Sequence, residues 1–257
     1  MKPTITGIIA LFLWLMVMGC DQPAVDRKTT EVVRDKDGRI ISGTYKKYDA
    51  AGKLEAVMHF KDRKLHGKAT KYYADGKTVR SELNYDMGRL NGLQKRYYAS
   101  GKLYKEEPFV MGKRHGLVKK YRESGLLMSE ARYKNGFAGT DLKEYLTNGK
   151  LKKKYPIIVV EEDDNLLKNG TYTLRVYLSD KSKNVKYYLG KLDAGGYLHD
   201  GLDQQYNITD GVLTYTFPLQ PGQIVQHRFD FVARTPTRLN NTFVTTRTHR
   251  VKIVYPR

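Results

Sequence analysis

Few residues in this 257-residue chain have the types and spacing that catalysis or metal binding requires. The six histidines lack metal-ligand spacing, and His66 and His115 each precede a glycine at the same place in a repeat, which predicts turns. The acidic run 161–164 lacks the ligand order of a calcium loop and is interpreted as a solvated loop. No phosphate-binding loop or nucleophile elbow is present. We therefore expect no catalytic residue, no metal and no cofactor; a hydrolase is the least favoured class.

The most regular chemical feature is a row of basic residues, each of which directly precedes a tyrosine. The four members of this basic row are Lys47, Lys71, Arg96 and Lys120, and Glu144 takes the place of a fifth. In a sheet of hairpins they would lie about 9.6 Å apart, close to the Debye length, so a polyanion could meet one charge per unit. Alternatively, the row pairs across strands with a second series at the same period, which is the preferred interpretation. That series is Glu82, Glu106 and Glu130.

The positive charge is concentrated in the middle of the chain. Residues 43–152 hold 25 Lys and Arg against 12 Asp and Glu, whereas residues 157–257 hold 13 against 10. The preferred interpretation of this excess is a solvated basic face. The alternative is attraction to an anionic partner: an acidic protein, an anionic lipid, an anionic glycan or a nucleic acid. We do not expect a nucleic-acid partner.

A tandem repeat positions the basic row. Five glycines recur at intervals of 24 or 25 residues, each four residues beyond a tyrosine, at Gly52, Gly76, Gly101, Gly125 and Gly149. Between them apolar and polar residues alternate, and dipeptides such as Asn135-Gly136 indicate tight turns. Residues 40–155 are therefore predicted to form an elongated antiparallel sheet of five β-hairpins. Its ends need caps, which we expect near Ile40 and after Tyr155.

The tyrosines of the repeats allow two interpretations. As half-buried residues of a sheet, they pack against its apolar face. Alternatively, the second tyrosines of two units, Tyr73 and Tyr98, form an exposed aromatic strip for a sugar or a protein. The packing role is preferred.

The repeat pattern resembles a known family. The segments 72–77 and 97–102, which read Tyr-Tyr-Ala-Asp-Gly-Lys and Tyr-Tyr-Ala-Ser-Gly-Lys, resemble the MORN-repeat variant of bacterial proteins. The resemblance covers about 110 residues, and the fifth unit departs from it. Proteins of this kind are often described as antitoxin components, which implies an immunity-type protein that binds and neutralises a partner. The other hypothesis is a structural envelope protein that binds anionic lipid or glycan.

The N-terminus has the features of a targeting segment. The apolar run 8–18 predicts a signal peptide over residues 1–19, and Val17-Met18-Gly19-Cys20 resembles a bacterial lipobox. The resemblance implies acylation of Cys20, which is the only cysteine, so the chain would be a lipoprotein anchored in an envelope membrane. Which membrane carries it is left open. Residues 20–39 are polar and charge-balanced, which predicts a tether.

The last hundred residues have a different pattern, because the period stops after Lys154. Residues 156–257 are predicted to form a second domain. Seven strand-like runs are separated by turn signals, at residues 157–160, 171–178, 185–189, 205–209, 212–217, 224–232 and 243–254. This spacing is typical of an immunoglobulin-like β-sandwich. The whole chain is thus predicted to be all-β.

Overall fold

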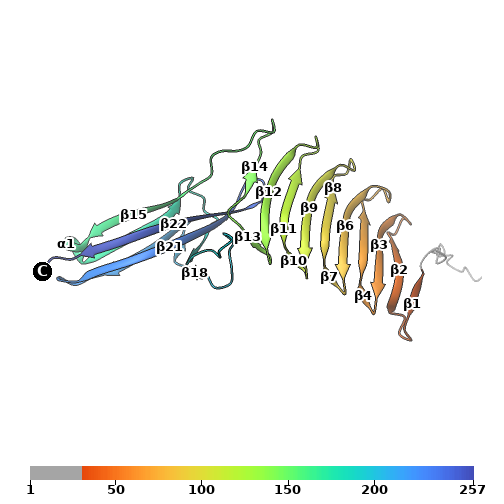
Figure 1. The fold of residues 1–257 in the computed structure, drawn as a ribbon, viewed down its shortest axis with the longest axis horizontal. Helices are drawn as coiled ribbons and strands as arrows, with labels where there is room; N and C mark the ends of the chain where they lie inside the picture. Colours follow the sequence, from red (N-terminus) through yellow and green to blue (C-terminus); the bar gives the residue numbers. More distant parts are fainter. Residues whose placement is uncertain (1–30) are drawn as a thin grey trace, which may run out of the picture.

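A computed structural model describes residues 31–257 (Figure 1), so the predicted signal peptide and Cys20 lie outside the described residues. The molecule is elongated. A long sheet from the repeats leads into a second unit that is built from longer strands, with the C-terminus at its far end. The all-β prediction is confirmed, because the described residues contain a single short helix. None of the described helical residues forms a segment long and apolar enough to cross a bilayer.

Four consecutive hairpins form the centre of the long sheet. Their strands are β2 (Ile40–Tyr48) and β3 (Leu54–Lys61), β5 (Gly67–Tyr72) and β6 (Val79–Asp86), β8 (Gly92–Tyr97) and β9 (Leu103–Val110), and β11 (Gly116–Tyr121) and β12 (Leu127–Lys134). After each hairpin the chain turns through a two-residue strand: β4 (Lys64–Leu65), β7 (Arg89–Leu90), β10 (Lys113–Arg114) and β13 (Phe137–Ala138). The strands pair in the order β1-β2-β3-β5-β6-β8-β9-β11-β12-β13, with antiparallel partners throughout.

The five periodic glycines lie in the turn within each repeat unit, and all have positive φ angles, between 70° and 88°. A second series of glycines lies in the turns that follow the hairpins. At Asn135 and Gly136 the backbone φ angles are 51° and 91°, as a type I′ hairpin turn requires. The equivalent turns place Met87 and Met111 before glycines, with φ angles of 43° and 48°. Residues that carry a Cβ atom disfavour positive φ, whereas glycine adopts it readily. A glycine at the second turn position therefore lowers the conformational cost of these turns.

Both ends of the repeat sheet differ from the sequence prediction. Part of the predicted tether over residues 20–39 forms the edge strand β1 (Val32–Arg34), which pairs with β2, so Ile40 begins the second strand and not the edge. The prediction of five complete hairpins is also wrong, because the fifth unit contributes only the short strand β14 (Lys143–Glu144) and a bridge between Tyr145 and Leu151. The fifth unit lacks the alternating apolar run that a full hairpin needs.

The C-terminal unit is a two-sheet sandwich. One sheet has the order β15 (Ile158–Asn165), β16 (Thr171–Leu178), β20 (Val212–Pro218), β19 (Ile208–Thr209); the other has β18 (Asp203–Gln205), β17 (Lys186–Leu189), β21 (Ile224–Pro236), β22 (Thr242–Val254). In chain order these are the A-B-E-D and C′-C-F-G sheets of the immunoglobulin fold, so that prediction is confirmed. The short helix α1 (Leu166–Asn169) joins β15 to β16.

The acidic run 161–164 lies within β15 and not in a loop, where it pairs with β16. Strand pairing supplies the backbone partners, and Tyr172, Tyr177 and Arg175 supply partners for the acidic side chains. No group of three or more His, Cys, Asp or Glu residues within residues 31–257 could hold a metal ion.

The hydrophobic core of the sandwich lies between its sheets. Leu174, Val176 and Leu178 of β16 are fully buried, and they belong to one cluster with Phe229 and Phe231 of β21. The two phenylalanine rings stack with their centroids 5.3 Å apart. The sandwich therefore has its own core, which the single-layered repeat sheet lacks.

We predict that Phe231→Ala lowers the free energy of unfolding of the sandwich by about 3–5 kcal/mol, because Phe231 is 1% exposed and its removal leaves a cavity. Leu167→Ala, at an 85% exposed site on α1, serves as the control and should change stability by less than about 0.5 kcal/mol. Urea unfolding followed by circular dichroism measures both. Equal effects of the two substitutions would contradict the assigned core.

Candidate binding face and its closed end

The strand register places the basic row on one face of the repeat sheet. Lys47 lies opposite Ala56, and two residues further along β3 Met58 lies opposite Tyr45. Residues two apart in a strand share a face, so the closing aromatics of the repeats lie on this face too: Phe60, Tyr85, Phe109 and Tyr133. We call this surface the basic face. It combines cations with half-buried aromatic rings.

The first three members of the basic row are exposed, but their charges are compensated differently. Lys47 pairs with Glu55 at 2.7 Å, and the hydrogen bond and charge of the Glu55 carboxylate raise the pKa of Lys47. Arg96 lies 4.0 Å from the buried carboxylate of Glu107. Lys71 has no acidic partner within ion-pair distance among residues 31–257.

Lys120, the fourth member of the row, is buried and not available to an external polyanion. Its side chain is 6% exposed, and its Nζ donates to the carbonyl oxygens of Leu239 at 2.9 Å and Asn240 at 3.0 Å. Both acceptors lie in the turn between β21 and β22. Burial, together with the nearby Lys105 cation, lowers the pKa of Lys120 to about 8. The sandwich thus covers the basic face at its last repeat.

The expected pairing of the basic row with three glutamates is wrong. Each of these glutamates lies one residue along its strand from the residue that faces the row, so it points to the opposite face. There Glu82, Glu106 and Glu130 pair with Lys68, with Lys95 at 3.9 Å and with Lys143 at 3.7 Å, respectively. The first tyrosines lie on that face as well, and not against the closing aromatics. Tyr97 donates to Glu82 at 2.8 Å and Tyr121 to Glu106 at 3.0 Å.

Tyr73 and Tyr98 tie neighbouring repeats together and do not form an exposed strip. Each hydroxyl donates to a backbone carbonyl of the next repeat: Tyr73 to Tyr97 at 2.6 Å and Tyr98 to Tyr121 at 2.7 Å. Arg122 continues the series, with its Nη2 2.7 Å from the carbonyl oxygen of Tyr145. Both tyrosine rings are half-buried.

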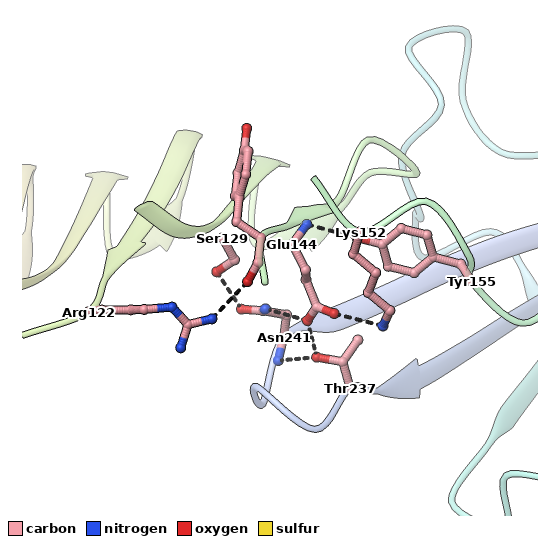
Figure 2. Close-up of polar contacts among 8 residues, drawn as sticks. Arg122, Ser129, Glu144, Lys152, Tyr155, Thr237 and Asn241 are labelled. Atoms are coloured by element: carbon pink, nitrogen blue, oxygen red, sulfur yellow. Dashed lines mark hydrogen bonds and ion pairs between the residues drawn. The ribbon is translucent and has the colours of Figure 1, made fainter. Parts of the chain in front are cut away.

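Glu144 organises the covered end of the basic face (Figure 2). Its carboxylate accepts hydrogen bonds from Thr237 and, at 2.8 Å, from Asn241 Nδ2, both at the tip of the β21–β22 hairpin. Lys152 Nζ lies 3.0 Å from its other oxygen. Burial alone would raise the pKa of Glu144, but these donors outweigh burial and hold the pKa below its usual range. The carboxylate therefore stays charged at neutral pH inside the joint.

The joint also has an apolar part. Val118, Ala131 and Tyr133 of the last repeat share a buried cluster with Phe243 and Val244 of β22. Tyr155 stacks on Phe243, with ring centroids 5.0 Å apart, and its hydroxyl accepts a hydrogen bond from the Glu144 amide at 2.8 Å. The joint is therefore built like a protein–protein interface, with an apolar core and a buried polar network.

Four segments of the repeat sheet match one family model, described as the MORN repeat variant. The matched segments are residues 41–62, 65–86, 90–111 and 114–135. The chain carries four MORN-variant repeats. The fifth unit is not matched. No curated protein matches the chain.

MORN repeats are in general protein- or membrane-interaction repeats, which agrees with the mixed basic and aromatic character of the basic face. In this chain the fourth MORN repeat already contacts the sandwich through that face. Sequence reasoning missed this joint. The signal that could have revealed it is Glu144, which breaks the basic row at the first position after the last complete repeat.

The depressed pKa of Lys120 predicts a stability that rises with pH. The unfolded chain holds the lysine proton up to about pH 10.4, whereas the folded protein releases it near pH 8. Between these values the unfolded state binds more protons, so stability rises with pH, by at most about 1.4 kcal/mol per unit. We therefore predict that the free energy of unfolding of the protein rises relative to that of Lys120→Met between pH 7 and pH 10. Denaturant unfolding of both proteins over this range measures the difference.

Lys71→Met, at an exposed site of the same row, is the matched control. Its free energy of unfolding should change with pH in parallel with that of the unsubstituted protein. If the free energy of unfolding of Lys120→Met also changed in parallel with that of the unsubstituted protein, the burial of a charged Lys120 in the joint would be contradicted.

Proposed function

We propose that this chain is a non-catalytic binding protein of the cell envelope, whose basic face receives an acidic protein partner. The observation that carries the proposal is the difference between the two ends of that face. The last repeat is covered by the sandwich, while the first three present Lys47, Lys71 and Arg96 beside half-buried aromatic rings. Aromatic residues and arginine are enriched in protein interfaces, and the two lysines add charge complementarity to an acidic partner.

The joint supplies an internal example of what the basic face can bind. At the fourth repeat, the row position is filled by Lys120, which binds two carbonyl oxygens of a β-hairpin turn. In the first three repeats the corresponding residues, Lys47, Lys71 and Arg96, are exposed, so the sandwich does not cover them. A partner that offers carbonyl or carboxylate oxygens along the row would match these positions.

The membrane anchor and the identity of the partner belong to the same proposal. The lipobox residues that end at Cys20 support acylation there, which would hold the basic face close to an envelope membrane. The resemblance of the repeats to antitoxin components makes the capture and neutralisation of a partner protein the most concrete version. Direct binding of anionic lipid or glycan through the same lysines is the competing outcome.

The test compares two charge reversals of equal size. Lys47→Glu with Lys71→Glu alters the basic face. Lys61→Glu in β3 with Lys68→Glu in β5 alters two exposed cations of the opposite face. Proteins captured from a membrane extract are quantified by mass spectrometry for each variant. We expect the basic-face variant to capture at least about tenfold less of a specific set of proteins, and the opposite-face variant to capture them normally. The reason is that juxtaposed like charges weaken binding strongly.

Capture that is equally affected by both variants would reflect net charge and contradict the proposal. A parallel arm measures sedimentation with vesicles of anionic lipid. If the basic-face variant loses vesicle binding but retains every captured protein, the basic face is a lipid site and the protein-partner proposal fails.

A further inference from the structure

A groove of about 1310 Å³ lies beside the joint, away from the exposed part of the basic face. The turn at residues 145–148 forms one wall, and the tip of the β21–β22 hairpin forms another. The connector 152–157, which links the repeats to the sandwich, runs along it. Figure 2 shows the inner part of this region, where Lys152 and Tyr155 lie beside Glu144 and Thr237.

The lining of this groove carries a positive charge. It contains five basic residues, namely Arg122, Lys152, Lys153, Lys154 and Arg238, against the two acidic residues Glu144 and Asp180. Lys152 neutralises Glu144 within the joint. The remaining four cations therefore face one carboxylate, an excess of three positive charges. Lys153, Lys154 and Arg238 are exposed.

The connector also offers free backbone groups. Its ends are fixed, because the Lys152 amide donates to the Glu144 carbonyl oxygen at 2.8 Å and the Ile157 amide donates to Ser179 Oγ at 3.1 Å. Between them, the backbone of residues 153–155 belongs to no strand and makes no hydrogen bond to another described residue. A backbone segment with free donors and acceptors can serve as a template for an added strand.

Apolar side chains complete the groove. Leu146 and Ile157 line it while 48% and 62% exposed, and the stacked rings of Tyr155 and Phe243 line it as well. A site for a simple polyanion would not need these apolar side chains. An extended peptide uses all three features, because its backbone pairs with the connector while its side chains alternate between the apolar wall and the cations.

We propose that this groove binds an extended acidic peptide segment of a partner protein, as a strand added alongside the connector 153–155. The bound segment would place acidic side chains against Lys153, Lys154 and Arg238 and apolar side chains against Leu146 and Ile157. The site is separate from the exposed basic face, so it does not depend on the function proposed above.

The first test measures binding of a fluorescein-labelled ten-residue peptide of alternating Glu and Val to the full chain in non-ionic detergent, by fluorescence anisotropy. The combined substitution Lys153→Glu with Lys154→Glu should weaken binding at least about tenfold, whereas Lys61→Glu with Arg80→Glu, which alters net charge equally, should change it less than about twofold. The peptide with Gln in place of Glu should bind at least about tenfold more weakly than the acidic peptide.

Equal affinity for the Glu and Gln peptides, or no effect of the Lys153 and Lys154 substitutions, would overturn the proposal. So would binding of inorganic polyphosphate or anionic vesicles through these lysines with no binding of the peptide. A peptide N-methylated at alternate residues tests the strand pairing and should bind at least about tenfold more weakly. Unchanged binding of that peptide would overturn the added-strand geometry.

Discussion

A single-layered sheet cannot bury either of its faces by itself, and this constraint shapes the whole molecule. Each MORN-repeat hairpin obtains its stability from neighbouring hairpins, so the array needs an end that is covered. The sandwich, which has its own core of buried β16 and β21 residues, provides that cover. The polar network around Glu144 and the apolar cluster around Phe243 join the two units. The position of the exposed face follows from this attachment.

The same row of side chains therefore has two environments, which depend on position along the array. Cross-strand neighbours link Arg96 to Lys105, Lys105 to Lys120, Lys120 to Ser129 and Ser129 to Glu144. At one end of this line the cations are exposed to solvent. At the other end they are buried, and hairpin carbonyl oxygens and a buried carboxylate compensate for the lost water. The change from exposed surface to structural joint takes place within one repeat.

Local patterns made much of the fold predictable. The alternation in residues 171–178 and 243–254 placed β16 exactly and β22 within one residue, because period-two patterns bounded by turn residues have few other solutions. The hairpin turns of the repeats were predictable for the same reason. Six of the seven predicted runs of the sandwich each overlap one strand, whereas the run 205–209 is divided between β18 and β19, which lie in different sheets.

The errors at the basic face concern contacts between residues that are distant in sequence, or the face of the sheet on which a residue lies. The burial of Lys120 depends on Leu239 and Asn240, more than a hundred residues later, and no local pattern carries that information. The ties made by Tyr73 and Tyr98 depend on how successive repeats stack. The pairing of the repeat glutamates was mispredicted because a shift of one residue along a strand changes the face.

The central claim is that the buried Glu144 network fixes the sandwich against the last MORN repeat and so defines which part of the basic face is open. Spin labels at Lys61→Cys in the repeats and Leu167→Cys in the sandwich, with Cys20→Ser, allow pulsed electron spin resonance to measure the distance distribution between the two units. The account predicts a narrow distribution that broadens when Glu144→Ala leaves Lys152, Thr237 and Asn241 without their shared acceptor. A broad distribution before this substitution, or an unchanged narrow one after it, would contradict the account.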